Sequence, residues 1–217
     1  MTEQILSAIY EHKLIAIVRG VDTKQCVQVA QALYDGGIRL MEITYDQQHP
    51  ETWEQTAQTI GAVAEAFAGK MYVGAGTVTT PELVELTARH GGQFVLSPDT
   101  DGAVICRTRE LGLVSIPGAM TPIEILQAYK AGAHIVKLFP AGIFGPEYLK
   151  AIKAPISHVP ILTVYKMTPD NVAEYLRAGA VAAGVGGRLV NPAWVEAGEF
   201  EKITCAAREF VAAVQEV

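Results

Sequence analysis

The stretch His134-Ile135-Val136-Lys137-Leu138-Phe139 decides the fold of this 217-residue chain. It is short and almost entirely apolar, which is the pattern of a strand that is covered on both faces. Seven similar runs occur elsewhere, and longer amphipathic stretches separate them, which predicts parallel βα units. The eight expected strands are roughly 14–19, 39–44, 71–76, 93–97, 113–117, 134–139, 159–163 and 181–185.

Helix signals fill the stretches between these strands. Thr80 and Thr121 each precede a proline, which places a capping hydroxyl before a residue suited to the first helical turn. A leading helix is expected over about 3–11 and a last long helix over about 192–215. No GxGxxG motif follows the first strand, and eight regular units can close a ring. The sequence therefore predicts an α/β fold, a parallel (β/α)8 TIM barrel with the leading helix across its bottom, rather than an open doubly wound sheet.

Composition limits the organisation and the partners of the chain. Half of the residues are apolar and 18% are charged, and no linker divides the sequence, so we expect one barrel domain over residues 1–217. The net charge of −6 and the lack of a basic run argue against nucleic acid as a partner. No apolar run is long enough for a membrane, and the first residues contain no apolar signal core. We therefore expect a cytoplasmic protein with no membrane partner.

The cysteines and histidines give no sign of a metal site or a disulfide framework. The three cysteines lack CxxC spacing, and the five histidines lack HxH and HExxH spacing. The GxSxG motif of serine hydrolases is absent as well. We expect neither a metal nor a cofactor.

Polar residues at the carboxyl ends of the strands are the candidates for chemistry, because that end carries the active site of such barrels. Lys137 stands in an otherwise apolar run, where an ammonium is costly unless its pKa falls or a partner holds it. It is either an amine nucleophile or a lysine that pairs with Glu42 and fills polar space. Glu42 is correspondingly either a general acid and base or a counter-ion. The other polar residues at strand ends are Arg19, Thr44, Thr77, Ser97 and Thr163.

Two of these residues, and a glycine pair after the last strand, have two interpretations each. Arg19 can clamp a substrate carboxylate through its planar fork or form a surface ion pair. Thr77 can donate a hydrogen bond to the same carboxylate or cap the next turn. Gly186-Gly187, at the end of the last strand, can cradle a phosphate with backbone amides or form a tight turn. Together with Thr163, these residues are the expected substrate-binding set.

Six motifs carry a family resemblance: Ile-Val-Arg-Gly at 17–20, Met-Glu-Ile-Thr at 41–44, Val-Gly-Ala-Gly-Thr-Val at 73–78, Leu-Ser-Pro at 96–98, Ile-Pro-Gly-Ala-Met-Thr-Pro at 116–122 and Val-Lys-Leu-Phe-Pro-Ala at 136–141. Their order, over essentially the whole chain, resembles the KDPG/KHG aldolase family. The resemblance implies a homotrimeric barrel enzyme of carbohydrate metabolism, a lyase that needs no metal. Its expected reaction is the reversible cleavage of 2-keto-4-hydroxy acids, such as 2-keto-3-deoxy-6-phosphogluconate or 4-hydroxy-2-oxoglutarate, to pyruvate and an aldehyde.

The resemblance also implies roles for individual residues. Lys137 is expected to form an imine, or Schiff base, with the keto acid, as in a class I aldolase. Glu42 is expected to move protons through a water. Arg19 and Thr77 are expected to hold the pyruvate carboxylate. The pocket walls are expected to be Pro98 and Phe139.

Two departures from the family pattern bear on the substrate. Many members have an arginine four residues after the strand-2 glutamate, where this chain has Asp46, so Arg19 would supply that charge. The family usually has Gly-Gly after the seventh strand, where this chain has Tyr165-Lys166. Two large side chains should block backbone amides from the distal end or phosphate of the substrate, so we expect an altered substrate range and no tight phosphate site. Lys166 could instead offer its ammonium to a substrate anion. The alternative is that both side chains point to solvent. The sequence leaves open whether the pair is natural or engineered.

The sequence is also compatible with other classes of function. A barrel that has lost turnover would be a non-catalytic binder of small oxo acids or an oligomeric scaffold, and a decarboxylase or isomerase is a third possibility. Lys137 discriminates between them, because a binding module needs no imine-forming amine. A metal-dependent decarboxylase would need clustered carboxylates, which the sequence does not show. The lyase is therefore the first hypothesis.

Overall fold

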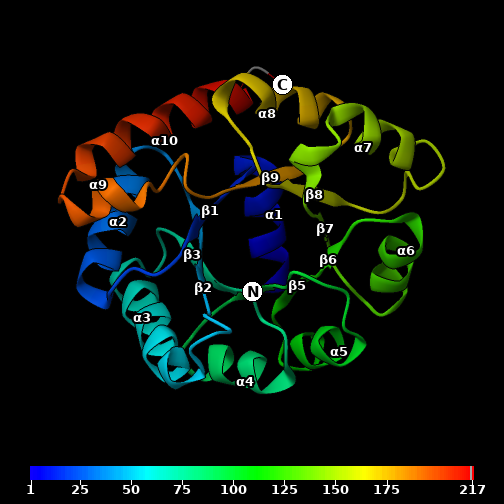
Figure 1. Cartoon of the computed structure of the whole chain (residues 1–217). Helices are drawn as coiled ribbons and strands as arrows, with labels where there is room; N and C mark the ends of the chain where they lie inside the picture. The colour runs from blue at the N-terminus through cyan, green and yellow to red at the C-terminus, as the bar shows by residue number, and fades with distance from the viewer. Residues whose placement is uncertain (216) are drawn as a thin grey trace.

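Parallel strands form a nearly closed barrel in the computed structural model, which describes residues 1–215 and 217, and helices surround it (Figure 1). The strands are β1 (Leu14–Val18), β2 (Leu40–Thr44), β3 (Tyr72–Gly76), β4 (Phe94–Leu96), β5 (Val114–Ile116), β6 (Gly118–Ala119), β7 (Val136–Leu138), β8 (Ile161–Val164) and β9 (Ala182–Val185). The α-helices are α1 (Thr2–His12), α2 (Thr23–Asp35), α3 (Trp53–Ala66), α4 (Pro81–Arg89), α5 (Gly102–Glu110), α6 (Pro122–Lys130), α7 (Pro146–Lys153), α8 (Pro169–Arg177), α9 (Pro192–Glu196) and α10 (Phe200–Gln215). Two short 3-10 helices are η1 (Pro50–Thr52) and η2 (Ala141–Ile143).

The predicted fifth strand is present as two pieces, β5 and β6, on either side of Pro117. Neighbouring strands pair in the order β5-β4-β3-β2-β1-β9-β8-β7-β6, so β5 pairs with β4 and β6 pairs with β7. Proline has no backbone N–H to donate, which interrupts the ladder. The ring still continues across the break, because Lys137 N donates to Pro117 O at 2.8 Å and His134 N donates to Ser115 O at 3.0 Å. The predicted (β/α)8-type barrel is therefore confirmed.

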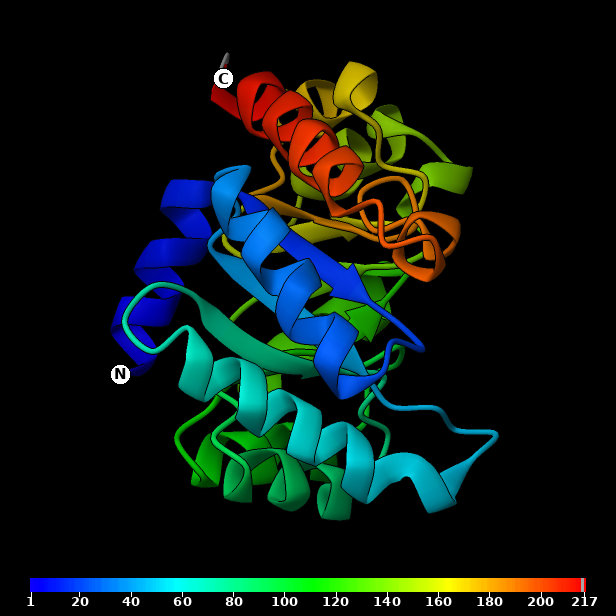
Figure 2. The ribbon, with the colours of Figure 1, turned by 90° about the vertical axis from the view of Figure 1, so that its left-hand side faces the viewer.

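Helix α1 covers the end of the barrel at which the strands begin (Figure 2). Its Ile5 and Ile9 are fully buried and pack with lumen residues such as Ile15 and Phe94. A second and larger apolar layer lies between the outer face of the sheet and the surrounding helices. The predicted leading helix is therefore confirmed, and it covers the end of the lumen opposite the carboxyl ends of the strands.

Alternation along each strand decides which side chains enter the lumen. On β2, Met41 and Ile43 belong to the outer layer, whereas Leu40 belongs to the lumen cluster. Glu42 and Thr44 therefore share the lumen face with Leu40. The same alternation on β7 places Lys137 in the lumen, because Val136 and Leu138 pack outside, whereas Ile135 and Phe139 contact the lumen cluster.

Helix boundaries follow the predicted caps, with one exception. Thr80 Oγ1 accepts a hydrogen bond from Leu83 N at 3.4 Å, and Thr121 forms a reciprocal capping box with Glu124. The prediction of one long helix over 192–215 is wrong, because the backbone is left-handed at Gly198, with a φ of 70°, and separates α9 from α10. Within the described residues, no helix combines the length and the apolarity needed to cross a membrane.

Candidate active site

Lys137 places an amine inside the lumen. Its side chain is only 7% exposed, and none of the ion pairs within the described residues includes it. Burial lowers the pKa of Lys137, the charge of Arg19 lowers it further, and the carboxylates of Glu42 and Asp99 act in the opposite direction. A lowered pKa leaves more of the amine neutral and nucleophilic near neutral pH.

Glu42 contributes a carboxyl group to the same lumen and is 3% exposed. It lies against the bare backbone of Gly76 on β3, where an added Cβ would come within 2.7 Å of Glu42 Oε1. The other oxygen, Oε2, has no hydrogen-bond partner in the described part of the chain. Burial raises the pKa of Glu42 to about 7, although the positive charges of Lys137 and Arg19 oppose the shift. A carboxyl with such a pKa can both accept and release a proton at neutral pH.

Arg19 and Thr77 meet where β1 and β3 end. Arg19 Nη2 donates to Thr77 Oγ1 at 3.3 Å, and the backbone of Thr77 is left-handed, with a φ of 58°. That conformation is strained for a β-branched residue, and such strain often marks a functional position. Gln47 stabilises the turn by donating to Thr77 O at 2.8 Å and accepting from Thr79 Oγ1 at 3.0 Å. Gln47 was not predicted from the sequence, because a polar loop residue outside any motif gives no sign of a tertiary contact.

The two expected wall residues are both close to Lys137. The Phe139 ring centroid lies 5.2 Å from Lys137 Nζ. Pro98 approaches the strand next to β7, because a Cβ at Gly118 would come within 2.3 Å of Pro98 O, and Gly118 pairs with Lys137. Asp99, which follows Pro98, was not expected in the site, yet its charge acts on the pKa of Lys137.

The segment after β8 holds two large residues in a glycine-like backbone conformation. The φ angles are 92° at Tyr165 and 57° at Lys166, both in the left-handed region. Asn171 Nδ2 donates to Lys166 O at 3.0 Å, and a Cβ at Gly142 would come within 2.2 Å of Tyr165 O. The backbone turn is thus held from two sides while both side chains stay exposed.

A cavity of about 580 Å³ opens between this segment and the end of β9. Lys166 and Arg188 line it together with Gly186 and Gly187, and no acidic residue is among its lining residues. Neither cation takes part in any ion pair of the described residues. Arg188 was not among the residues predicted from the sequence, although it directly follows Gly186-Gly187. The cavity is therefore positively charged.

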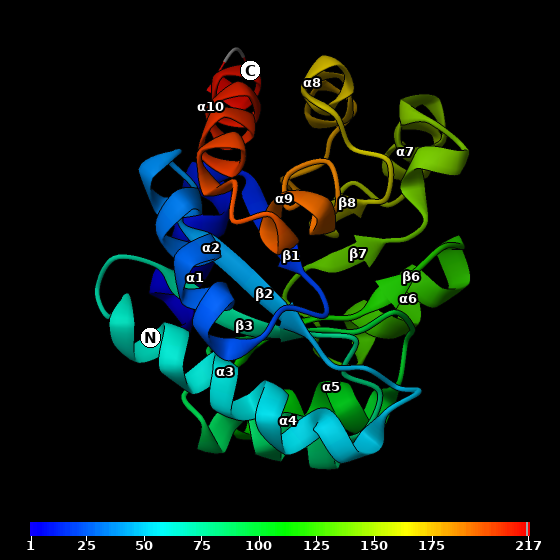
Figure 3. The same ribbon diagram turned by 60° about the vertical axis from the view of Figure 1, so that its left-hand side comes forward.

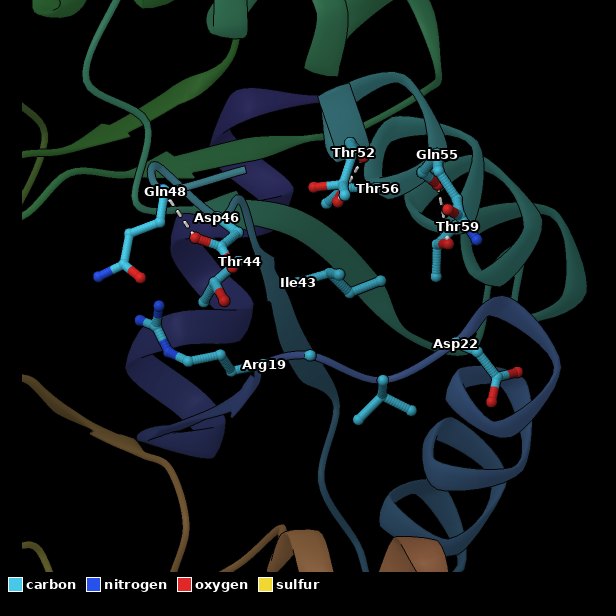
Figure 4. A pocket seen from close by; sticks show the side chains of 12 residues that line it. Arg19, Asp22, Ile43, Thr44, Asp46, Gln48, Thr52, Gln55, Thr56 and Thr59 are labelled. Atoms are coloured by element: carbon cyan, nitrogen blue, oxygen red, sulfur yellow. Dashed lines mark hydrogen bonds between the residues drawn. The ribbon is translucent and has the colours of Figure 1, made fainter. Parts of the chain in front are cut away.

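A second cavity, of about 460 Å³, lies between the loops that follow β1 and β2 (Figure 4). Arg19, Thr44 and Asp46 line it. The Asp46 carboxylate accepts a hydrogen bond from Gln48 N at 2.8 Å, in a loop that projects past the ends of the strands (Figure 3). No ion pair of the described residues joins Asp46 to Arg19. Asp46 therefore does not compete with an anionic ligand for the guanidinium.

Thr163 is the one expected substrate-binding residue that the structure directs away from the lumen. Its neighbours Leu162 and Val164 belong to the lumen cluster, whereas Ile161 packs outside. Thr163 is fully buried, and its hydroxyl donates to Met167 Sδ at 3.7 Å. The period of two along a strand turns this side chain toward the helix layer, so its hydroxyl does not face the lumen, and the expected substrate contact stays a prediction.

The lumen thus holds an unpaired amine and a carboxyl with a raised pKa, and an arginine–threonine pair lies at the strand ends that form its mouth. The alternative in which Lys137 merely pairs with Glu42 is disfavoured, because no ion pair of the described residues joins them. Within residues 1–215 and 217, no group of three or more side chains could hold a metal ion. This arrangement can form an imine with a carbonyl carbon and transfer protons next to it.

Several known proteins are similar to this chain in sequence or in fold. The model of the family "KDPG and KHG aldolase" matches residues 5–206. The 2-dehydro-3-deoxy-6-phosphogalactonate aldolase of Escherichia coli (strain K12) is 37% identical over 177 residues, which cover 81% of this chain and 83% of that protein. A structure described as native KDPGal has a TM-score of 0.85 and 35% identity and covers 94% of each chain. A KDPG aldolase structure from Legionella pneumophila, with pyruvate captured as a covalent carbinolamine, shares the fold at a TM-score of 0.83 and 22% identity, over 93% of this chain and 95% of that one. The chain therefore belongs to the KDPG and KHG aldolase family and is a class I aldolase, a lyase.

Proposed function

We propose that this enzyme reversibly cleaves the C3–C4 bond of a 2-keto-4-hydroxy acid and releases pyruvate and an aldehyde. The observation that carries the proposal is the buried, unpaired amine of Lys137, which shares the lumen with Glu42. A binding module or scaffold would have no use for this amine, and its burial without an ion-pair partner would only reduce stability.

The reaction starts when the Lys137 amine attacks the C2 carbonyl and water leaves, which gives a protonated imine. The Glu42 carboxylate then removes the proton of the C4 hydroxyl, which lets the C3–C4 electron pair move toward the imine, so that the aldehyde departs and an enamine remains. A proton delivered from Glu42 to C3 restores the imine. Water then hydrolyses the imine, releases pyruvate and regenerates the free amine.

We assign the carboxylate of the keto acid to Arg19 and Thr77. The Arg19 guanidinium offers several parallel N–H donors to a carboxylate, and Thr77 adds a hydroxyl 3.3 Å from Nη2. A carboxylate anchored there would present its adjacent carbonyl carbon to the lumen. Pro98 and Phe139 would then exclude water from the face of the imine.

We infer that the distal end of the substrate, beyond the cleaved bond, is anionic and meets Lys166 and Arg188. These two cations line the 580 Å³ cavity without an acidic neighbour among its lining residues. Side-chain cations would there replace the backbone amides that a Gly-Gly segment exposes. This arrangement suits a carboxylate or phosphate held at the rim more than a phosphate enclosed by backbone.

Trapping with pyruvate and sodium borohydride tests the proposal. The reduced adduct is expected on Lys137 by peptide mapping, and Lys137→Met should lose both the adduct and cleavage while keeping the fold. A matched control is Lys150→Met, which changes an exposed lysine of α7. An adduct on Lys166, or cleavage by Lys137→Met, would contradict the assignment.

We also propose a homotrimer. Large apolar side chains are exposed around α6 and η2: Ile123 is 69%, Ile143 58% and Phe144 54% exposed. Tyr148 joins the two regions, because its hydroxyl donates to Met120 O at 2.8 Å and its ring lies 5.1 Å from that of Phe144. Light scattering should give three times the 23.3 kDa chain mass, and Phe144→Glu should lower that value. Location in the cytoplasm stays a prediction from the sequence.

A further inference from the structure

Thr44 has a buried hydroxyl that neither the fold nor the proposed mechanism uses. Its side chain is 5% exposed, and its Oγ1 has no hydrogen-bond partner in the described part of the chain. Among those residues, the only other buried side-chain polar atom in this condition is Glu42 Oε2. Buried polar groups in folded proteins nearly always have partners, so two such atoms on neighbouring lumen residues of one strand indicate a shared ligand.

Glu42 and Thr44 are two residues apart on β2 and share its lumen face. Side chains at this spacing start about 6.6 Å apart along a strand. One oxygen atom that makes two hydrogen bonds can join partners up to about 5.6 Å apart. Two side chains that start this close on one face of a strand can therefore share a single bridging oxygen.

Gly76 fixes the direction of both side chains. An added Cβ there would come within 2.7 Å of Glu42 Oε1 and 2.9 Å of Thr44 Cγ2. Glu42 therefore contacts β3 through Oε1, and Thr44 contacts it through its methyl group. The other atoms, Glu42 Oε2 and Thr44 Oγ1, are left free for a ligand. In Figure 4, Thr44 projects to the same side of β2 as the Arg19 guanidinium, whereas Ile43 projects to the other side, toward α3.

We propose that Thr44 is a positioning residue that holds, together with Glu42, the water molecule that carries protons between Glu42 and C3 of the enamine. Water suits this place because it can donate to the carboxylate and accept from, or donate to, the hydroxyl. The proton moves from the Glu42 carboxyl to the water while the water gives another proton to C3, so the water is unchanged and Glu42 ends as a carboxylate. This inference rests on the proposed aldolase reaction.

The experiment uses the half-reaction with pyruvate alone, in which the enzyme exchanges the C3 protons of pyruvate for deuterium in heavy water. Thr44→Val keeps the shape and removes the hydroxyl. We expect it to slow exchange and cleavage by the same factor, about 10- to 100-fold, because the water that carries the proton loses one of the two hydrogen bonds that position it. Borohydride trapping on Lys137 should stay at the wild-type level, and Thr44→Ser should restore exchange to within about threefold.

Thr108→Val is the matched control, because Thr108 is also a buried threonine, but its hydroxyl donates to Val104 O at 2.7 Å within α5. It should exchange at the wild-type rate. Unchanged exchange in Thr44→Val would overturn the proposal, and a loss confined to cleavage would also overturn it by placing the hydroxyl on the C4 oxygen. Failure of the wild type to form the Lys137 adduct would instead refute the aldolase assignment, so the two failures are distinguishable.

Discussion

The rings of Phe139 and Tyr165 meet edge to face, with centroids 6.2 Å apart and an interplanar angle of 88°. Phe139 lies next to Lys137 at the end of β7, and Tyr165 begins the atypical segment after β8. Through this contact, the Tyr165 ring lies beside the residue that borders Lys137. Aromatic pairs favour this edge-to-face arrangement. The departure from Gly-Gly therefore acts on the pocket as well as on the surface.

Removing the Tyr165 side chain should open the distal cavity. We expect Tyr165→Gly to raise kcat/KM for phosphorylated keto acids relative to short ones by about tenfold, which corresponds to about 1.4 kcal/mol. The measurement is the ratio of kcat/KM for the two substrate classes. Tyr165→Phe keeps the ring and should keep the wild-type ratio; an unchanged ratio in Tyr165→Gly would show that the ring does not limit the pocket.

The same segment should gain or keep stability when glycine replaces its left-handed residues. A left-handed non-glycine residue costs roughly 1–2 kcal/mol, and glycine loses roughly 0.5–1 kcal/mol to backbone entropy. Tyr165→Gly combined with Lys166→Gly should therefore change the free energy of unfolding by about 0 to +3 kcal/mol, because two such differences add. Denaturant unfolding measures it, and a clear loss of stability would mean that side-chain contacts such as the Phe139 ring pair outweigh the strain.

The two cations of the 580 Å³ cavity should act on anionic substrates only. Arg188→Met and Lys166→Met should each raise KM for a substrate with a distal carboxylate or phosphate by about tenfold, the effect of losing one charge-assisted contact. KM for an uncharged aldehyde partner should change little. Steady-state kinetics with a charged and an uncharged substrate of equal length separates these cases, and equal effects on both would refute the anion assignment.

Gly76 should be required for the position of Glu42. In Gly76→Ala the new Cβ would come within 2.7 Å of Glu42 Oε1 and must displace it. We expect cleavage to fall by about 100-fold, the usual contribution of a general acid and base, while pyruvate trapping on Lys137 persists. Gly102→Ala is the control, because a Cβ there meets nothing within 4 Å. Retained cleavage in Gly76→Ala would mean that Glu42 is not held by this contact.

Glu42 should make the protein less stable as the pH rises toward neutrality. Its pKa is about 7 in the folded protein and 4.5 as the ordinary value, so the folded state binds this proton more tightly than the unfolded chain. The stability that this provides is fully present below pH 4.5 and is lost as the pH rises through 7. Glu42→Gln has no titrating group at this position. Between pH 4.5 and 7, its free energy of unfolding should therefore rise relative to that of the wild type by on the order of 3 kcal/mol. Urea unfolding at several pH values tests this, and parallel curves would contradict it.

The sequence by itself determined the barrel and most of the chemistry. Strands that are apolar on both faces and capped helices leave few other folds, and Lys137 and Glu42 stood out because a charge in such a strand is costly. The period of two along a strand also places Thr163 on the outer face of β8, with Ile161 and opposite Leu162. The split at Pro117 was also readable, since proline cannot donate to a ladder.

Only the tertiary structure decided which distant groups meet. The Gln47 contact with Thr77, the approach of Asp99 to Lys137 and the unpartnered hydroxyl of Thr44 each depend on neighbouring strands and loops. Arg188 joins Lys166 for the same reason, because β8 and β9 end side by side. Local sequence sets periodicity and caps through forces that act over a few residues. The pKa values and the free hydrogen-bonding atoms of a site depend on burial and on charges that the closed barrel brings together.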